Sequence, residues 1–230
     1  METEGLLFRL TTWIVPLVFA IVLHEISHGW VANAFGDPTA KDLGRLSPNP
    51  IRHVDPFGTV VLPLILAVTG APVFGWAKPV PVVAARMRNP RLHMMLVALA
   101  GPGMNLALAL IAAFVLAFVL GTADQPPGFA TVFVIANLSN FVLINVFLAI
   151  FNLLPVPPFD GGHVVEGLLP RPLAEKWRAM GRYAFVILIG LLLVLPMVAP
   201  QLNVVRWLVV PPVQLVLGGI AALAGLGAPG

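Results

Sequence analysis

Residues 13–35 read WIVPLVFAIVLHEISHGWVANAF, an apolar run interrupted by a histidine, a glutamate and a second histidine. A run of this length and composition predicts a helix that crosses a membrane. Histidines four residues apart face the same way on a helix, so His24 and His28 can grip one zinc ion. Glu25 would then be placed to take a proton from a water that the zinc activates. A charged residue at the centre of a membrane helix costs about 2.5–3.5 kcal/mol, which predicts that Glu25 serves chemistry rather than packing.

The composition of the whole chain is that of a membrane protein. Hydrophobic residues make up 59% of its 230 residues and charged residues 10%, against about 25% charged in a typical soluble domain. The formal charge of +3 is too small and too scattered to indicate nucleic acid. The absence of cysteine excludes disulfides, thiolate metal ligands and a cysteine nucleophile. The length predicts one membrane-embedded domain over residues 1–230, and the acidic start predicts a first helix that is retained rather than cleaved.

Hydropathy predicts an all-α polytopic membrane fold with about five full transmembrane helices. A further apolar stretch, residues 58–70, would reach about 20 Å as a helix, short of the ~30 Å hydrocarbon core. It is interpreted as re-entrant, with a sixth crossing as the alternative. Three prolines near residues 72–83 predict an extended strand or loop there. The five expected full spans are residues 6–35, 92–120, 129–151, 183–199 and 207–226.

Basic residues predict the orientation. If residues 58–70 re-enter, the loops at 36–91 and 161–182 lie on the same side of the membrane. These loops hold 11 of the 13 basic residues, so the positive-inside rule places them in the cytoplasm. We therefore expect a multi-pass protein of the cytoplasmic (inner) membrane, with the His-Glu motif toward the cytoplasmic side.

A catalytic zinc site usually takes three protein ligands and leaves one position open. Asp160 is the favoured third ligand because it lies in NLLPVPPFDGG, residues 152–162, at the end of a predicted span and at the same expected depth as the His pair. The prolines break the helix there and the glycines permit a tight turn. His163, which follows the glycines, is a candidate to hydrogen-bond one of the metal ligands rather than the metal itself. Of the remaining candidates, His53 and His93 are expected to be polar residues at the membrane interface. Glu166 is expected to be solvated or in a salt bridge.

These motifs together resemble the site-2 protease family of intramembrane zinc metalloproteases. HEISH in one apolar helix and NLLPVPPFDGG at the end of a later one carry the resemblance. Four further stretches resemble its compact prokaryotic branch, which lacks PDZ and nucleotide-sensing CBS domains: FGDPTAKDLGRLSPNP, VDPFGT, GWAKPVPV and ALAGPGMN. One departure is His163, where many relatives carry arginine.

The resemblance implies a set of roles. One Zn²⁺ per chain would be bound by His24, His28 and Asp160, with Glu25 as the general base. Asn152 would hydrogen-bond the backbone of the substrate, and the GWAKPVPV segment would pair with an unwound substrate strand. The implied partners are transmembrane protein substrates within the lipid bilayer; nothing in the sequence indicates an oligomeric state.

Other functions fit the sequence less well. A serine intramembrane protease would need a Gly-x-Ser motif with a partner histidine, and an aspartyl one would need two membrane aspartates, of which only Asp160 qualifies. The alternative from another class is a non-hydrolytic membrane protein that binds or transports metal through the same His pair.

The stretch ALAGPGMN, residues 98–105, predicts close helix packing. Gly101 and Gly103 are expected to permit helix contact, and Asn105 to hydrogen-bond between helices rather than to act in catalysis.

Overall fold

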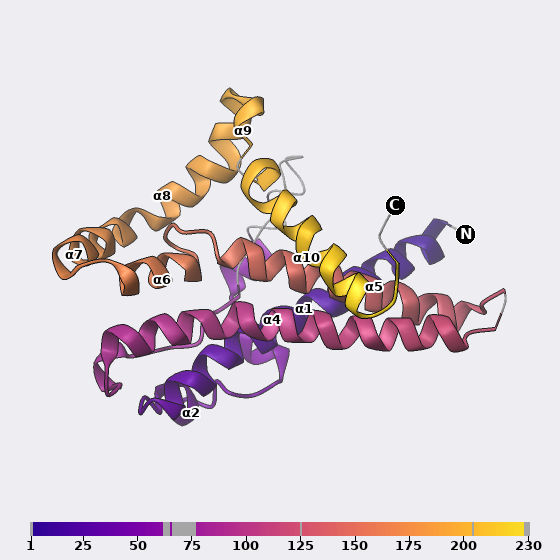
Figure 1. The fold of residues 1–230 in the computed structure, drawn as a ribbon, viewed down its shortest axis with the longest axis horizontal. Coiled ribbons are helices and arrows are strands. Elements are labelled where there is room, and N and C mark those ends of the chain that lie inside the picture. The colour runs from indigo at the N-terminus through magenta and orange to yellow at the C-terminus, as the bar shows by residue number, and fades with distance from the viewer. Residues whose placement is uncertain (1, 62–64, 66–76, 125, 204, 228–230) are drawn as a thin grey trace.

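All secondary structure in the described part of the chain is helical, without a strand, which confirms the predicted all-α fold. Figure 1 shows this arrangement in a computed structural model. The structure describes residues 2–61, 65, 77–124, 126–203 and 205–227.

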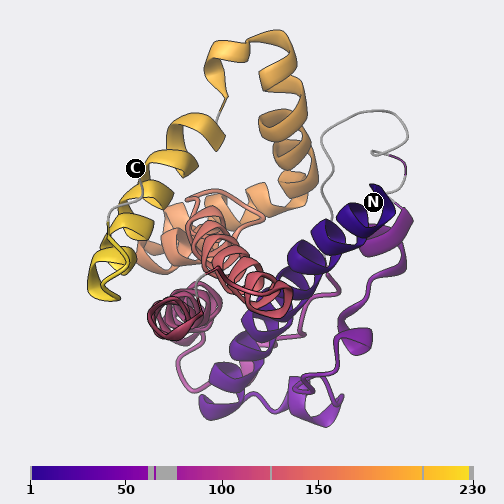
Figure 2. The ribbon, with the colours of Figure 1, turned by 90° about the vertical axis from the view of Figure 1, so that its right-hand side faces the viewer.

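Three long helices form the centre of the molecule. α4 (Pro90–Thr122) and α5 (Phe129–Asn152) are antiparallel neighbours, and α1 (Glu2–Ala34) packs against both (Figures 1 and 2). Small fully buried residues at their contacts, such as Ala109 and Ala113 on α4, let the backbones approach closely.

Within the described residues, four helices are long and apolar enough to cross a membrane: Gly5–Ala34, Pro90–Thr122, Phe129–Asn152 and Val205–Leu223. The last comprises η7 (Val205–Val209) and α10 (Val210–Leu223), which packs on α5 and α4. Large apolar side chains cover the outside of these helices; Phe118 on α4 is 70% exposed. Such surfaces suit lipid and not water, so the chain is a membrane protein.

The span expected at 183–199 is helical but shorter and interrupted. It consists of α8 (Ala184–Ile189), the π-helical η5 (Gly190–Val194) and α9 (Leu195–Val198). Its 15 residues, 184 to 198, extend about 22 Å, less than the ~30 Å hydrocarbon core. Pro196 removes one backbone donor from this helix, which favours the interruption.

The connecting segments contain short helices. Between α1 and α4 lie α2 (Thr39–Asp42), η1 (Pro50–His53), η2 (Pro56–Val61) and η3 (Ala84–Arg86). Between α5 and α8 lie α6 (Asp160–Leu168), α7 (Arg171–Met180) and η4 (Gly181–Tyr183), and η6 (Pro200–Leu202) follows α9. In Figure 1, α2, α6 and α7 gather at the end of the molecule where α1 ends and α4 begins.

Two sequence predictions fall partly on residues that the structure does not describe. Whether 58–70 re-enters or crosses depends on 62–64 and 66–70, which lie outside the described residues. Of the extended region expected at 72–83, residues 77–83 are described and form a loop without strand pairing.

Candidate metal centre

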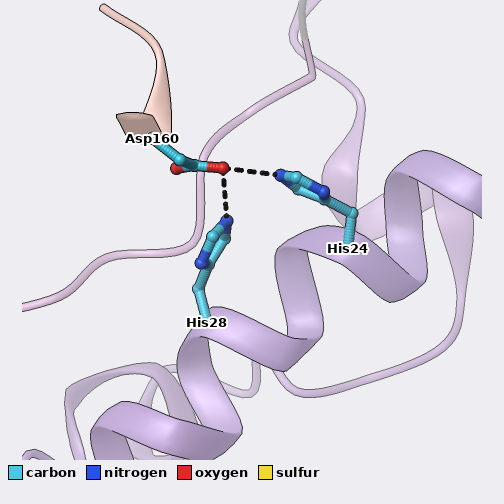
Figure 3. Close-up of side chains that lie close together, drawn as sticks. All are labelled: His24, His28 and Asp160. Carbon is cyan, nitrogen blue, oxygen red and sulfur yellow. Dashed lines mark ion pairs between the residues drawn. The ribbon is translucent and has the colours of Figure 1, made fainter. Parts of the chain in front are cut away.

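Two histidines of α1 and one aspartate of α6 converge on a single point (Figure 3). His24 and His28 lie about one helical turn apart, and Asp160 is the first residue of α6. Asp160 Oδ2 lies 3.2 Å from Nε2 of His24 and 3.5 Å from Nε2 of His28. Within the described residues this is the one group of three or more His, Cys, Asp or Glu with metal-binding spacing. The structure thus brings together the three predicted residues.

Hydrogen bonds set the form of both imidazoles. His24 Nδ1 lies 2.5 Å from Oδ1 of Asn105, and His28 Nδ1 lies 2.7 Å from the carbonyl oxygen of Val97. Both partners are acceptors, so each Nδ1 carries a proton and each neutral ring turns its Nε2 lone pair toward Asp160. Asp160 Oδ2 is buried and accepts no hydrogen bond. Three acceptors therefore face one another with no proton between them, an arrangement that a cation stabilises.

The donor set and its spacing fit zinc. Two nitrogens and one carboxylate oxygen are a common catalytic zinc set, and bonds of 2.0–2.2 Å in a tetrahedron separate two ligand atoms by about 3.3–3.5 Å. The two separations from Asp160 Oδ2 are 3.2 Å and 3.5 Å, and all three ligand atoms lie within 4.8 Å of one another. The carboxylate of Asp160 would supply the anionic oxygen of this set, and the two neutral imidazoles its nitrogens.

Gly101 of α4 leaves the space into which the imidazoles project. A Cβ atom at this position would lie 2.5 Å from His24 Cε1 and 2.5 Å from His28 Nε2. No larger residue fits there without displacing the rings. At Gly103, by contrast, an added Cβ would meet no described atom within 4 Å, so the close contact predicted for Gly103 is not found.

The turn between α5 and α6 places Asp160. α5 ends at Asn152, and the following turn, which contains a cis peptide bond between Pro157 and Pro158, leads to α6. A Cβ at Gly161 would lie 2.3 Å from the carbonyl oxygen of Leu153. Gly161 lies within the first turn of α6 and its φ is not positive. The glycine is needed for close backbone packing, not for the tight turn that the sequence predicted.

Comparison with known proteins places these residues in a family. The profile of peptidase family M50 matches residues 12–141 and 125–195, a range that contains His24, His28 and Asp160. The chain belongs to peptidase family M50. It is a zinc metalloprotease of the site-2 protease type, as the resemblance in the sequence implied.

Similar proteins come from several bacteria. The chain is 38% identical over 178 residues to "Putative zinc metalloprotease YwhC" of Bacillus subtilis (strain 168), covering 77% of this chain and 78% of that protein. It is 31% identical over 196 residues to "Putative zinc metalloprotease Rip2" of Mycolicibacterium smegmatis, covering 83% of this chain and 67% of that protein. Against Rip2 of Mycobacterium tuberculosis (strain ATCC 25618 / H37Rv) the identity is 34% over 205 residues, covering 85% and 70%. No solved structure matches the chain significantly.

Asn105 holds His24 of this metalloprotease in place. Asn105 is fully buried, and its Nδ2 donates to the carbonyl of Ala20 at 3.3 Å and to Oδ1 of Asn145 at 2.7 Å. These bonds fix the amide so that Oδ1 faces His24. Asn105 therefore links α1, α4 and α5, as predicted, and also orients an imidazole, which the sequence analysis missed. The available signal was its position four residues after Gly101, on the same face of α4.

Two further histidines lie elsewhere. His53, for which an interfacial position stays a prediction, is buried within the protein, and its Nε2–H donates to the carbonyl of Ser47 at 2.9 Å. The backbone of His53 is also held within the connection between α1 and α4, because its carbonyl accepts from the N–H of Lys78 at 2.8 Å. His93 stacks on the ring of Phe35 with centroids 4.1 Å apart.

His163 and Glu166 lie together on α6. Nδ1 of His163 is 3.7 Å from Glu166 Oε2, and Glu166 Oε1 pairs with Arg178 at 2.6 Å. The salt bridge predicted for Glu166 is present. Neither residue belongs to the group of metal-binding spacing.

Glu25 and Asn152 make contacts that bear on their predicted roles. Glu25 Oε2 accepts a hydrogen bond from the backbone N–H of Val80 at 2.9 Å. Asn152 Nδ2 donates to the carbonyl of Leu148 at 3.0 Å within α5. The substrate contact predicted for Asn152 stays a prediction.

Proposed function

We propose that this metalloprotease hydrolyses peptide bonds in or near transmembrane segments of membrane proteins. The observation that carries the proposal is the depth of His24. It lies ten residues before Ala34, where the span Gly5–Ala34 ends, which is about 15 Å along the helix axis. A peptide bond must reach this level of the membrane to be cleaved, and the polypeptides present at this level are transmembrane segments.

The roles proposed for hydrolysis are those that the resemblance to the family implied. Zinc held by His24, His28 and Asp160 would activate water and polarise the scissile carbonyl. Glu25 accepts the proton of the attacking water and delivers it to the leaving amine. Asn152, at the end of α5, hydrogen-bonds the substrate backbone near the scissile bond.

The orientation rests on charge. The two connecting regions that hold 11 of the 13 basic residues include α2, α6 and α7, which gather at one end of the molecule (Figure 1). The positive-inside rule favours the cytoplasm for this end. The site then opens toward the cytoplasmic side of the inner membrane, where its partners are transmembrane protein substrates.

The Glu25→Gln variant tests the chemistry. Glutamine keeps an oxygen that can accept from Val80 N–H but loses the base, and general-base catalysis contributes about 10²–10⁴-fold. We expect cleavage to fall by at least about 100-fold, with zinc retained at one ion per chain. Fragments of membrane proteins are compared by mass spectrometry between cells with wild-type and variant enzyme, and metal content is measured on the purified proteins.

The same comparison separates the alternatives. Fragments that depend on Glu25 and map to apolar segments support intramembrane hydrolysis and identify the substrate. Fragments confined to soluble domains would contradict the proposed substrate class. A pattern unchanged by Glu25→Gln would remove Glu25 as the base.

A further inference from the structure

Two buried charged residues have no part in the chemistry described so far. Asp37 follows α1 and is 1% exposed, and Arg45 follows α2 and is 9% exposed. Burying a charge is costly unless it is well hydrogen-bonded. These two side chains do not pair with each other; both bind backbone atoms of residues 78–83, here called the 78–83 segment.

Asp37 and Arg45 hold opposite ends of this segment. Oδ2 of Asp37 accepts from the N–H of Val83 at 2.6 Å, and its Oδ1 accepts from the N–H of Thr39 at 3.1 Å and from the Thr39 hydroxyl. Arg45 Nη2 donates to the carbonyl of Lys78 at 2.7 Å. Burial opposes ionisation of Asp37, but these hydrogen bonds outweigh it and lower the pKa of the carboxyl. Both side chains are therefore charged at neutral pH. Asp37 and Arg45, with their hydrogen bonds to the 78–83 segment, are here called the clamp.

Glycines turn the chain just before each clamping residue. Gly36 has φ of +107° and Gly44 has φ of +63°, a region that favours glycine. Each turn brings the next side chain back toward the 78–83 segment. Asp37 and Arg45 are thus aimed by the local backbone.

The 78–83 segment depends on side chains because its own backbone offers few donors. Pro79 and Pro81 have no N–H, so Val80 is the lone donor of the Pro-Val-Pro unit. That donor is given to Glu25 Oε2 at 2.9 Å. Val80 is 8% exposed and packs beside Gly29 of α1, where an added Cβ would lie 2.9 Å from Val80 Cγ1. Gly29 lets the segment approach α1 one turn beyond Glu25.

We propose that Asp37 and Arg45 are positioning residues that fix the 78–83 segment so that the Val80 N–H holds the Glu25 carboxylate beside the metal centre. This rests on the proposed role of Glu25 as base. Without the bond from Val80 the glutamate side chain is free to change rotamer, and it leaves the orientation needed for proton transfer. Because the predicted metal ligands belong to α1 and α6, we expect zinc binding to survive loss of the hydrogen bonds of Asp37 and Arg45.

Hydrogen exchange of the full chain in lipid nanodiscs tests the clamp without requiring turnover. In Asp37→Asn and Arg45→Gln, backbone amides of the 78–83 segment should exchange at least about tenfold faster than in the wild type. Exposed residues of the same region supply matched controls, Asp42→Asn and Arg88→Gln, which should match the wild type. Glu25→Ala should speed exchange of the Val80 amide. Zinc content should be equal in the two clamp variants, the controls and the wild type.

Kinetics with dye-labelled casein, an unfolded probe, tests the positioning. Displacement of a catalytic group by about 1 Å costs about 100-fold, so kcat should fall by about that factor in both clamp variants with KM nearly unchanged. Val80→Pro removes the donor and should cause the same loss. The double variant Asp37→Asn/Val80→Pro should lose no more than Val80→Pro alone, because both changes remove one interaction.

Each outcome decides one proposal. Unchanged exchange in the clamp variants overturns the clamp whether or not casein is cleaved. Faster exchange with unchanged kcat, or loss of zinc, overturns the positioning role and leaves a structural one. If the wild type and Glu25→Gln cleave casein and membrane proteins equally, the proposed function fails. Exchange of the Val80 amide in Glu25→Ala still decides whether the Val80 N–H is bound to Glu25.

Discussion

At the scale of single residues, the metal centre depends on the absence of a side chain at Gly101. Replacement by alanine would place a methyl group 2.5 Å from His28 Nε2, one of the atoms that faces the metal position. We expect Gly101→Ala to weaken zinc binding by about 100-fold or more. Loss of a group that supports a metal ligand typically lowers metal affinity by about 10–100-fold, and a direct clash with the ligands should cost at least the upper value. Competition with a chelating dye measures this. Gly103→Ala, where the added Cβ meets no described atom within 4 Å, should bind zinc normally; equal loss in both variants would show that helix α4, not the space at Gly101, was disturbed.

Asn105 gives a second prediction at this scale. Asn105→Leu removes the acceptor of His24 Nδ1–H, which leaves the ring free to rotate and its tautomer undefined. Zinc affinity should fall by about 10–100-fold, and Asn105→Asp, which keeps an acceptor, should recover part of it. Asn140→Leu is the control, because Asn140 also bonds between helices, to the carbonyl of Thr12 at 2.8 Å, but outside the site. If that control weakens zinc binding equally, Asn105 acts through helix packing alone.

The individual residues differ in how far the sequence revealed them. His24 and His28 were predictable because helical geometry places them together, and Asp160 because a proline-rich helix end preceded it. The hold of Asn105 on His24 spans 81 positions and depends on the rotation of α4 against α1, which no local pattern encodes. The contact between His53 and the N–H of Lys78 likewise joins residues 25 positions apart.

At the scale of elements, α6 is placed by the turn that precedes it. Gly161→Ala would put a Cβ 2.3 Å from the Leu153 carbonyl oxygen and 2.4 Å from that of Leu154. Because both atoms are backbone, the turn or the helix must move, and overpacking of this kind costs about 1–3 kcal/mol. We expect a lower unfolding midpoint and weaker zinc binding in the same variant, measured by thermal unfolding and chelator competition. Gly181→Ala, in open space after α7, should change neither; normal zinc binding in Gly161→Ala would mean that Asp160 tolerates a shift of α6.

Elements that lie in lipid were the most predictable. Hydropathy located α1, α4 and α5 because membrane helices must be long and continuously apolar. It did not indicate α6 and α7, which are short and polar on one side, and it overestimated the helix at 184–198, which π-helical and proline-containing turns interrupt. Packing, rather than apolar length, determines those elements.

At the scale of the whole molecule, the distribution of charge and the position of the site make one joint prediction. The connecting regions that flank the metal centre carry most of the basic residues, whereas the loop between α4 and α5 lies at the opposite end of these helices (Figure 1). If the basic end is cytoplasmic, Asp124 in that loop and Glu175 on α7 face opposite sides of the membrane. Both side chains are exposed.

The natural absence of cysteine makes this orientation directly measurable. Single variants Asp124→Cys and Glu175→Cys each carry one thiol, and a membrane-impermeant maleimide labels only the thiol outside intact spheroplasts. We expect Asp124→Cys to be labelled in intact spheroplasts, and Glu175→Cys to be labelled only after lysis, with Glu25-dependent cleavage retained in both. The reverse pattern would place the metal centre toward the outer face, and peptide bonds on that side of substrate segments would then be the ones within reach of Glu25.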